Sequence, residues 1–129
     1  GADGRVVADG SHVGAVKDLT EGKVAGVVVD FVAEQGAELD GWAMTAPAGY
    51  QYIIGYGGQF VAQTLDFVAG EKSVICNIVG TYNDLAELMV LAQAGKVNLH
   101  TQKYALTDAL KALADLDAGN VRGRAILVP

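Results

Sequence analysis

Cysteine is nearly absent from this sequence, and the one residue of this type, Cys76, cannot form an intramolecular disulfide. It lies in the apolar run of residues 73–78, which favours a small buried side chain over a reactive thiol. Metal-binding patterns are missing as well. A zinc site needs three or four ligands, and Cys76 with the distant His12 and His100 has no ligand spacing. The sequence therefore predicts no metal site among these residues, and it predicts that His12 lies on a helix surface.

Basic residues are also few. Nine lysines and arginines stand against 15 aspartates and glutamates, which gives a net charge of −6. A nonspecific nucleic-acid surface needs a dense basic patch, so we expect no nucleic-acid partner. The sequence has no uninterrupted apolar run of about 18 residues and no signal-peptide pattern at its start. We therefore expect no membrane association and a cytoplasmic location.

The glycine-rich turn that seats a dinucleotide pyrophosphate, G-x-G-x-x-G, is missing, as is an acidic residue about 20 positions after it. Gly55, Gly57 and Gly58 have a different spacing, and no helix pattern follows them. The sequence thus contains neither of the two features with which a dinucleotide-binding fold normally seats the pyrophosphate and the ribose.

What the sequence does contain is enough apolar material for one core. Hydrophobic residues make up 51% of 129 positions, which predicts a single domain over residues 1–129. Strand and helix patterns alternate through the first half. We expect strands at 6–7, 24–29 and 50–54, with helices at 11–20 and 34–45. The β-branched run at 24–29 is typical of a parallel strand buried on both faces.

The second half continues the pattern with one irregular segment. Residues 60–67, from Phe60 to Phe67, alternate loosely and predict an edge strand, and a buried strand is expected at 74–79. Thr81 and Asp84 form a capping-box-like start to a helix that ends near Gly95. A last helix at 107–118 and a strand at 125–128 complete the prediction of an α/β fold with a parallel sheet. We expect the helix carboxylates to form solvated faces: Glu34, Glu38, Asp40, Asp115 and Asp117.

Ligands of open parallel sheets bind at the carboxyl ends of the strands. The informative loops are therefore those that follow residues 29, 54 and 79, and each contains glycine or a polar residue. Glycine lets backbone groups approach a flat ligand closely. By spacing alone this is a weak signal, because 17 glycines produce many turns by chance.

Several segments together resemble a known family. These are Gly1-Ala2-Asp3, Val29-Asp30-Phe31-Val32, Ile53-Ile54-Gly55, Gly80-Thr81, Ala94-Gly95-Lys96-Val97 and Arg122-Gly123-Arg124-Ala125-Ile126-Leu127-Val128-Pro129. Over essentially its whole length the chain is similar to the C-terminal part of medium-chain, zinc-containing, NAD-dependent alcohol dehydrogenases. The resemblance implies a partial Rossmann-like sheet without the first dinucleotide-binding βαβ unit. It also implies that zinc binds only in a catalytic domain that lies upstream of these residues.

The resemblance implies a partial NAD site, and it assigns residues to it. The segment at Phe31 and Val32 matches the adenosine side of the coenzyme cleft. The backbone of Ile54, Gly55 and Tyr56, and that of Asn77 to Val79, matches the groups that meet the nicotinamide carboxamide. Arg124 matches an arginine that contacts the coenzyme pyrophosphate, and a guanidinium can bond phosphate oxygens in pairs. The alternative for Arg124 is an arginine at the start of a surface strand.

Two classes of function follow. In the first, the chain is part of an NAD-dependent alcohol dehydrogenase, which transfers a hydride between an alcohol or carbonyl substrate and the coenzyme. The chain supplies half of the coenzyme cleft and is inactive by itself. In the second, it is a free-standing, non-catalytic interaction domain. Both predict a homodimer through an edge strand near residues 60–67, with residues 73–79 beside it. Substrate identity and the choice between NAD and NADP are outside what these residues encode.

Overall fold

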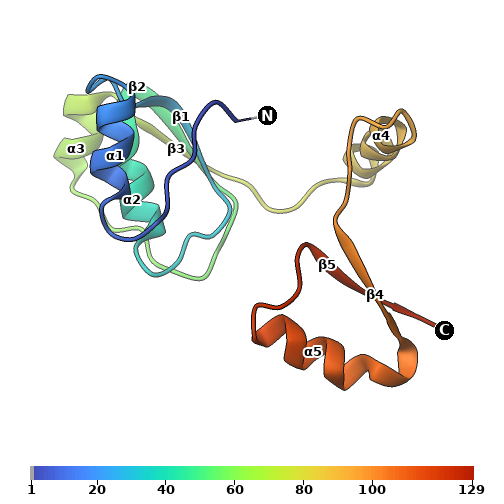
Figure 1. Cartoon of the computed structure of the whole chain (residues 1–129). Coiled ribbons are helices and arrows are strands. Elements are labelled where there is room, and N and C mark those ends of the chain that lie inside the picture. Colours follow the sequence, from blue (N-terminus) through green and yellow to red (C-terminus); the bar gives the residue numbers. More distant parts are fainter. Residues whose placement is uncertain (1) are drawn as a thin grey trace. The chain divides into compact units, whose positions relative to one another are not determined.

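The computed structural model describes residues 2–129, which form two compact units that divide between Val79 and Gly80 (Figure 1). Each unit is described by itself. The single-domain organisation expected from the sequence stays a prediction. None of the helices in the described part of the chain is long and apolar enough to cross a membrane.

The first unit is built on a three-stranded parallel sheet. Its strands are β1 (Ala25–Asp30), β2 (Thr45–Ile53) and β3 (Ser73–Cys76), in the order β1-β2-β3. Helix α2 (Ala37–Met44) connects the first two strands and packs on them, and α3 (Thr64–Gly70) connects the next two. Helix α1 (His12–Leu19) packs on α2. This confirms the expected α/β class with a parallel sheet and flanking helices.

Strand β1 is more open than its sequence suggests. The apolar run predicts a strand buried on both faces, but Val27 and Val29 are about half exposed. The reason is that only β2 pairs with β1 in the described residues. Cys76, expected to be buried, is exposed because it is the last residue of the edge strand β3. The strand expected at residues 6–7 is absent, and these residues form an irregular segment.

The predicted edge strand at residues 60–67 is also wrong. Its second half belongs to α3, and its first half is irregular. The cause is an aromatic cluster in which Phe60 and Phe67 pack against Trp42, with ring centroids 5.6 and 4.6 Å from the indole. The ammonium of Lys72 lies 4.8 Å from the Trp42 ring centre and donates a hydrogen bond to the Trp42 carbonyl oxygen. Burial in this cluster lowers the pKa of Lys72.

Polar side chains lie in the interior between α2 and β2. Gln51 is fully buried, and its Nε2 donates to the Glu38 carbonyl oxygen at 2.8 Å. Glu38 itself is buried, so the expectation of a solvated carboxylate is wrong for this residue. A Cβ atom at Gly41 would lie 2.6 Å from Gln51 Nε2, so alanine at this position would displace the buried amide.

The second unit begins with helix α4 (Tyr82–Gln93), whose start confirms the predicted capping box. The Thr81 hydroxyl accepts from the Asp84 backbone N–H, and the Asp84 carboxylate accepts from the Thr81 N–H. Those bonds to Thr81 hold the pKa of Asp84 below its usual value. Strands β4 (Thr101–Ala105) and β5 (Arg124–Val128) form a parallel pair, connected by η1 (Leu106–Asp108) and α5 (Ala109–Asp117). The sequence does not predict β4, because its mostly polar residues lack the apolar pattern that marks a buried strand.

A polar network joins α5 to β4. The Tyr104 hydroxyl donates to Asp115 Oδ2 at 3.0 Å, and Lys111 Nζ forms an ion pair with the same oxygen. Gln102 Nε2 donates to the Tyr104 oxygen at 2.8 Å. The bonds from Lys111 and Tyr104 lower the pKa of Asp115, while desolvation and the bond to Asp115 raise the pKa of Tyr104.

The stability of the second unit is expected to depend on the charge of Asp115. Because folding lowers the pKa of this carboxyl below 3.8, its contribution is present above that pH and is lost as the pH falls further. The variant Asp115→Asn should therefore unfold at lower urea concentration than the wild type at neutral pH. The difference should shrink in a urea series taken below pH 3.8. Asp117→Asn is the control, because it removes a neighbouring carboxylate near the end of the same helix. If the difference in unfolding midpoint between Asp115→Asn and the wild type stays constant with pH, the role assigned to the Asp115 charge is contradicted.

Candidate functional site

The carboxyl ends of the three parallel strands meet at one edge of the first unit. The last residues of the strands are neighbours in the register, with Asp30 opposite Ile53 and Ile53 opposite Cys76. The loops that follow therefore leave the sheet side by side. They contain seven of the eight residues predicted to contact a coenzyme: Phe31, Val32, Ile54, Gly55, Tyr56, Asn77 and Val79.

Asp30 accepts hydrogen bonds from two of these loops. Its Oδ1 accepts hydrogen bonds from the backbone N–H groups of Val32 at 2.9 Å and Ala33 at 2.8 Å, which fixes the turn after β1. Its backbone oxygen accepts from the N–H groups of Ile54 at 2.8 Å and Gly55 at 3.2 Å, which fixes the start of the next loop. Asp30 is 8% exposed, so water does not compete strongly for these bonds.

The two loops approach each other through their backbones at Gly55. A Cβ atom there would collide with the carbonyl group of Val32 and would lie 2.9 Å from the Phe31 oxygen. A second contact follows at Gly58, whose N–H donates to the Ala33 oxygen at 2.6 Å. The spacing of these glycines is thus required by loop packing, a role that the sequence could not separate from an ordinary turn.

Exposed apolar side chains surround this backbone platform. Phe31 and Val32 stand after β1, Tyr56 after β2, and Val79 after β3, and all four are more than half exposed. Asn77 is exposed as well, and its N–H donates to the Ile53 oxygen at 3.2 Å. Val79 has a φ of 37°, an unusual conformation for a β-branched residue. A flat apolar group could lie on this edge and reach backbone N–H and C=O groups.

Arg124, the eighth predicted residue, belongs to the second unit. It is the first residue of β5, where its N–H donates to the His100 oxygen at 3.0 Å. Its side chain is exposed, and Nη1 makes a long hydrogen bond of 3.4 Å to the neighbouring Gly123 oxygen. Within residues 2–129 the guanidinium has no stronger bond, so most of its donors remain free for a ligand.

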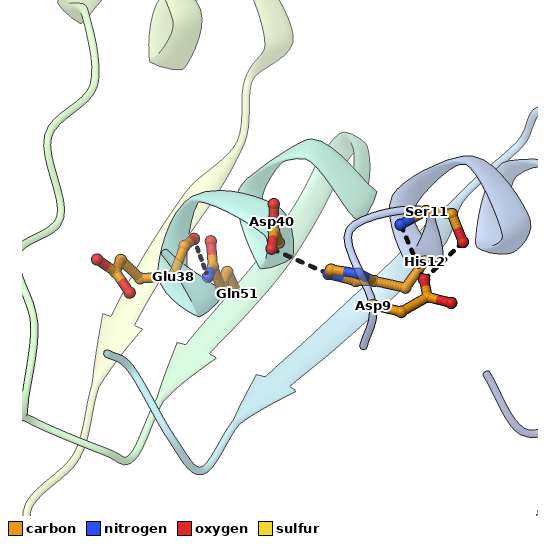
Figure 2. Close-up of polar contacts among 6 residues, drawn as sticks. All are labelled: Asp9, Ser11, His12, Glu38, Asp40 and Gln51. Carbon is orange, nitrogen blue, oxygen red and sulfur yellow. Dashed lines mark hydrogen bonds and ion pairs between the residues drawn. The ribbon is translucent and has the colours of Figure 1, made fainter. Parts of the chain in front are cut away.

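A polar cluster near α1 and α2 is not predicted by the sequence (Figure 2). His12 Nε2 lies 2.9 Å from Asp40 Oδ2, and the His12 side chain is only 17% exposed, so it is not a helix-surface residue. Asp9 accepts from the N–H and hydroxyl of Ser11, and these bonds lower its pKa. Nothing in the spacing of residues 12 and 40 marks them as partners, because the pair depends on how α1 packs against α2.

Potential metal ligands stay scattered. Among the residues that the structure describes, no three His, Cys, Asp or Glu side chains are placed to hold a metal ion together. The residues present therefore do not fit a zinc site.

Known proteins are similar to this chain over nearly its whole length. The family model of zinc-binding dehydrogenases matches residues 1–127. Among curated proteins, D-arabinose 1-dehydrogenase (NADP(+)) of Saccharolobus solfataricus is 28% identical over 115 residues, which is 88% of this chain and 33% of that protein. NAD-dependent alcohol dehydrogenase of Sulfurisphaera tokodaii is 27% identical over 119 residues, 91% of this chain and 34% of that protein.

A solved dehydrogenase structure is similar to this chain over its whole length. The alcohol dehydrogenase of the hyperthermophilic archaeon Aeropyrum pernix superposes with a TM-score of 0.93 at 35% identity, over 100% of this chain and 38% of that chain. The chain thus spans about a third of the length of the curated relatives that it matches.

Proposed function

Because the chain belongs to the zinc-binding dehydrogenase family, we propose that it forms part of an NAD-dependent alcohol dehydrogenase and supplies half of its coenzyme cleft. The observation that carries this proposal is the alignment of Asp30, Ile53 and Cys76 at one edge of a parallel sheet. That edge is where open α/β sheets bind their ligands. The whole enzyme would transfer a hydride between an alcohol or carbonyl substrate and the nicotinamide ring, which is the chemistry that the coenzyme supplies when bound.

The residues at this edge would bind and orient the coenzyme without reacting. The exposed Phe31 and Val32 would line the adenosine side. The backbone of Ile54, Gly55 and Tyr56, and that of Asn77 and Val79, would bond the carboxamide. Support comes from the packing at Gly55, which fixes the backbone at the start of the loop after β2 before a ligand arrives. Backbone contacts of this kind tolerate varied side chains around them.

Arg124 would bond the coenzyme pyrophosphate. Its exposed guanidinium makes only one long hydrogen bond within the described residues, so it has donors for phosphate oxygens. A charge-assisted bond of this kind contributes roughly 1.5–3 kcal/mol. The catalytic zinc and most of the substrate pocket would come from residues outside these 129, since the described side chains do not fit a metal.

We also propose a homodimer, formed through the outer edge of β3. The structure has no strand at residues 60–67, and β3 is the edge strand of the sheet. Its unpaired backbone groups are natural partners for a second copy related by a twofold axis. The cytoplasmic location stays a prediction from the sequence.

Replacing Arg124 by alanine tests the coenzyme role. The 129-residue chain should bind NADH weakly, since it lacks a glycine-rich phosphate turn. In Arg124→Ala the dissociation constant should rise about tenfold, equivalent to about 1.4 kcal/mol. Equilibrium dialysis at millimolar NADH measures both proteins.

Arg122→Ala is the matched control, because it removes the same charge two residues away, in the exposed turn that precedes β5. If the two variants lose the same affinity for NADH, the net charge of the chain and not a bond from Arg124 would explain the loss. If the wild-type chain binds no NADH at any concentration but sediments as a dimer, the non-catalytic interaction domain becomes the better account.

A further inference from the structure

Two acidic side chains lie against one pair of glycines in the first unit. The glycines are Gly57 and Gly58, in the loop that follows β2. A Cβ atom at Gly57 would collide with Glu34 Oε2. A Cβ atom at Gly58 would lie 3.0 Å from Glu38 Oε1 and 2.9 Å from the Ala33 backbone oxygen. The two glycines therefore leave open a small space that three oxygen atoms line.

Glu38 brings to this space a buried carboxylate that the described part of the chain does not satisfy. The residue is 5% exposed, and its Oε2 is buried without a hydrogen-bond partner. Figure 2 shows the carboxylate directed away from Gln51 and toward the loop after β2. A buried carboxylate without a compensating group is costly. The N-terminus of α2 offsets only part of the charge, because a helix end carries about half an elementary charge.

The chain does not supply the missing positive charge at this position. Among the residues placed by the structure, neither Glu34 nor Glu38 forms an ion pair with a lysine, arginine or histidine. The third oxygen is also an acceptor. The Ala33 carbonyl accepts from the Gly58 N–H at 2.6 Å and keeps a second lone pair. A ligand of this space must therefore be positively charged and must prefer oxygen.

We propose that Glu34, Glu38 and the Ala33 backbone oxygen bind a hard divalent cation of the Ca²⁺ type. Such a cation takes carboxylate, carbonyl and water oxygens in a flexible geometry. Two carboxylates are too few to hold a metal by side chains alone, so the carbonyl and water complete the coordination. Glu34 is exposed, which gives water access to the cation. Zinc does not suit this set, because it is bound mostly through nitrogen and sulfur.

The cation compensates the buried charge of Glu38 and joins the loop after β2 to the start of α2. The inference is independent of the proposed coenzyme role, because no residue assigned to the coenzyme is a ligand of the cation. Its test therefore needs no coenzyme. Trp42, the only tryptophan of the chain, lies in α2 and reports the unfolding of the first unit by its fluorescence.

Calcium should stabilise the first unit of the 129-residue chain. After metal ions are removed with EDTA, millimolar CaCl₂ should raise the melting temperature by about 5 °C relative to KCl of equal ionic strength, because the cation binds only the folded state. Glu34→Gln should weaken Ca²⁺ binding at least about tenfold, and Glu38→Gln should abolish the response. Without the cation, Glu38→Gln should be at least as stable as the wild type, since an amide of equal size replaces an uncompensated charge.

Glu71→Gln is the matched control, because it removes the same charge from an exposed position at the end of α3 and should keep the full response to Ca²⁺. A response that is lost in the Glu34 and Glu38 variants and kept in the control supports the inference. A wild-type chain that does not respond, or responds equally to KCl, overturns it. An unchanged response in Glu34→Gln also overturns it, and this exposed variant decides the matter if Glu38→Gln does not fold.

Discussion

Replacing Gly55 by alanine is expected to destabilise the first unit by about 3 kcal/mol, because the new methyl group has no space. The atoms that it would meet are backbone atoms, the Val32 carbonyl group and the Phe31 oxygen. Unlike the end of a long side chain, these cannot rotate away. The two loops would have to separate and give up the hydrogen bonds that the Ile54 and Gly55 N–H groups donate to the Asp30 backbone oxygen. Urea unfolding monitored by circular dichroism measures the loss, and weak NADH binding should disappear with it.

Gly26→Ala provides the matched comparison for Gly55→Ala. A Cβ atom at Gly26, in β1, would meet no heavy atom within 4 Å. Alanine in a strand interior is also slightly favoured over glycine, so stability should stay unchanged or rise. If Gly55→Ala unfolds at the same urea concentration as Gly26→Ala, the close packing of the two loops would be disproved.

Replacing Gly123 by alanine should destabilise the second unit by about 3 kcal/mol through two effects that add. Gly123 has a φ of 88°, where a side chain costs about 1 kcal/mol or more. In addition, a Cβ atom would collide with the His100 carbonyl oxygen and would lie 2.8 Å from its Cβ. The first paired residues of β4 and β5, Thr101 and Arg124, should separate. Urea unfolding and hydrogen exchange at the Arg124 amide measure these effects.

Gly119→Ala separates the two contributions at Gly123. Gly119 has a φ of 72°, but a Cβ atom there would meet no heavy atom within 4 Å, so its replacement carries the conformational cost alone. A loss of about 1 kcal/mol is expected. If the two variants lose the same stability, the collision with His100 contributes nothing and the explanation for Gly123 is wrong.

Sequence patterns predict an element correctly where neighbouring residues determine it. The β-branched run before Asp30 forms β1, and the Thr81 and Asp84 pair caps α4 through the two reciprocal bonds expected. The order α1, β1, α2 and β2 also follows from these patterns, whereas the strand expected at residues 6–7 is absent and α3 is not predicted. In each case neighbouring residues contain the information.

Sequence patterns fail where distant residues decide. Phe60 and Phe67 alternate like strand residues, but contact with Trp42 places the second of them in α3. His12 is half-buried only because α1 packs on α2, and Cys76 is exposed only because β3 is at the sheet edge. Such outcomes depend on tertiary packing, which no window of sequence contains.

In the candidate site, sequence patterns predict some features, and others depend on tertiary packing. Parallel strands predict that the loops after residues 29, 54 and 79 leave the sheet at one edge, and the register does place the ends of the three strands side by side. The third strand ends at Cys76, however, so Asn77 lies in the loop and not in the strand expected at 74–79. The roles assigned to these residues and to Arg124 come from resemblance and stay predictions. No sequence pattern assigns a role to Asp30. Its bonds to four backbone N–H groups exist only in three dimensions.

Those four bonds also decide how the edge responds to a ligand. Because one residue holds the turn after β1 and the start of the loop after β2, these two loops are joined to each other before a ligand binds. A ligand that contacts Tyr56 therefore meets the backbone of Phe31 already in place. The loss of loop entropy occurs when the chain folds, so binding at this edge needs to order only side chains.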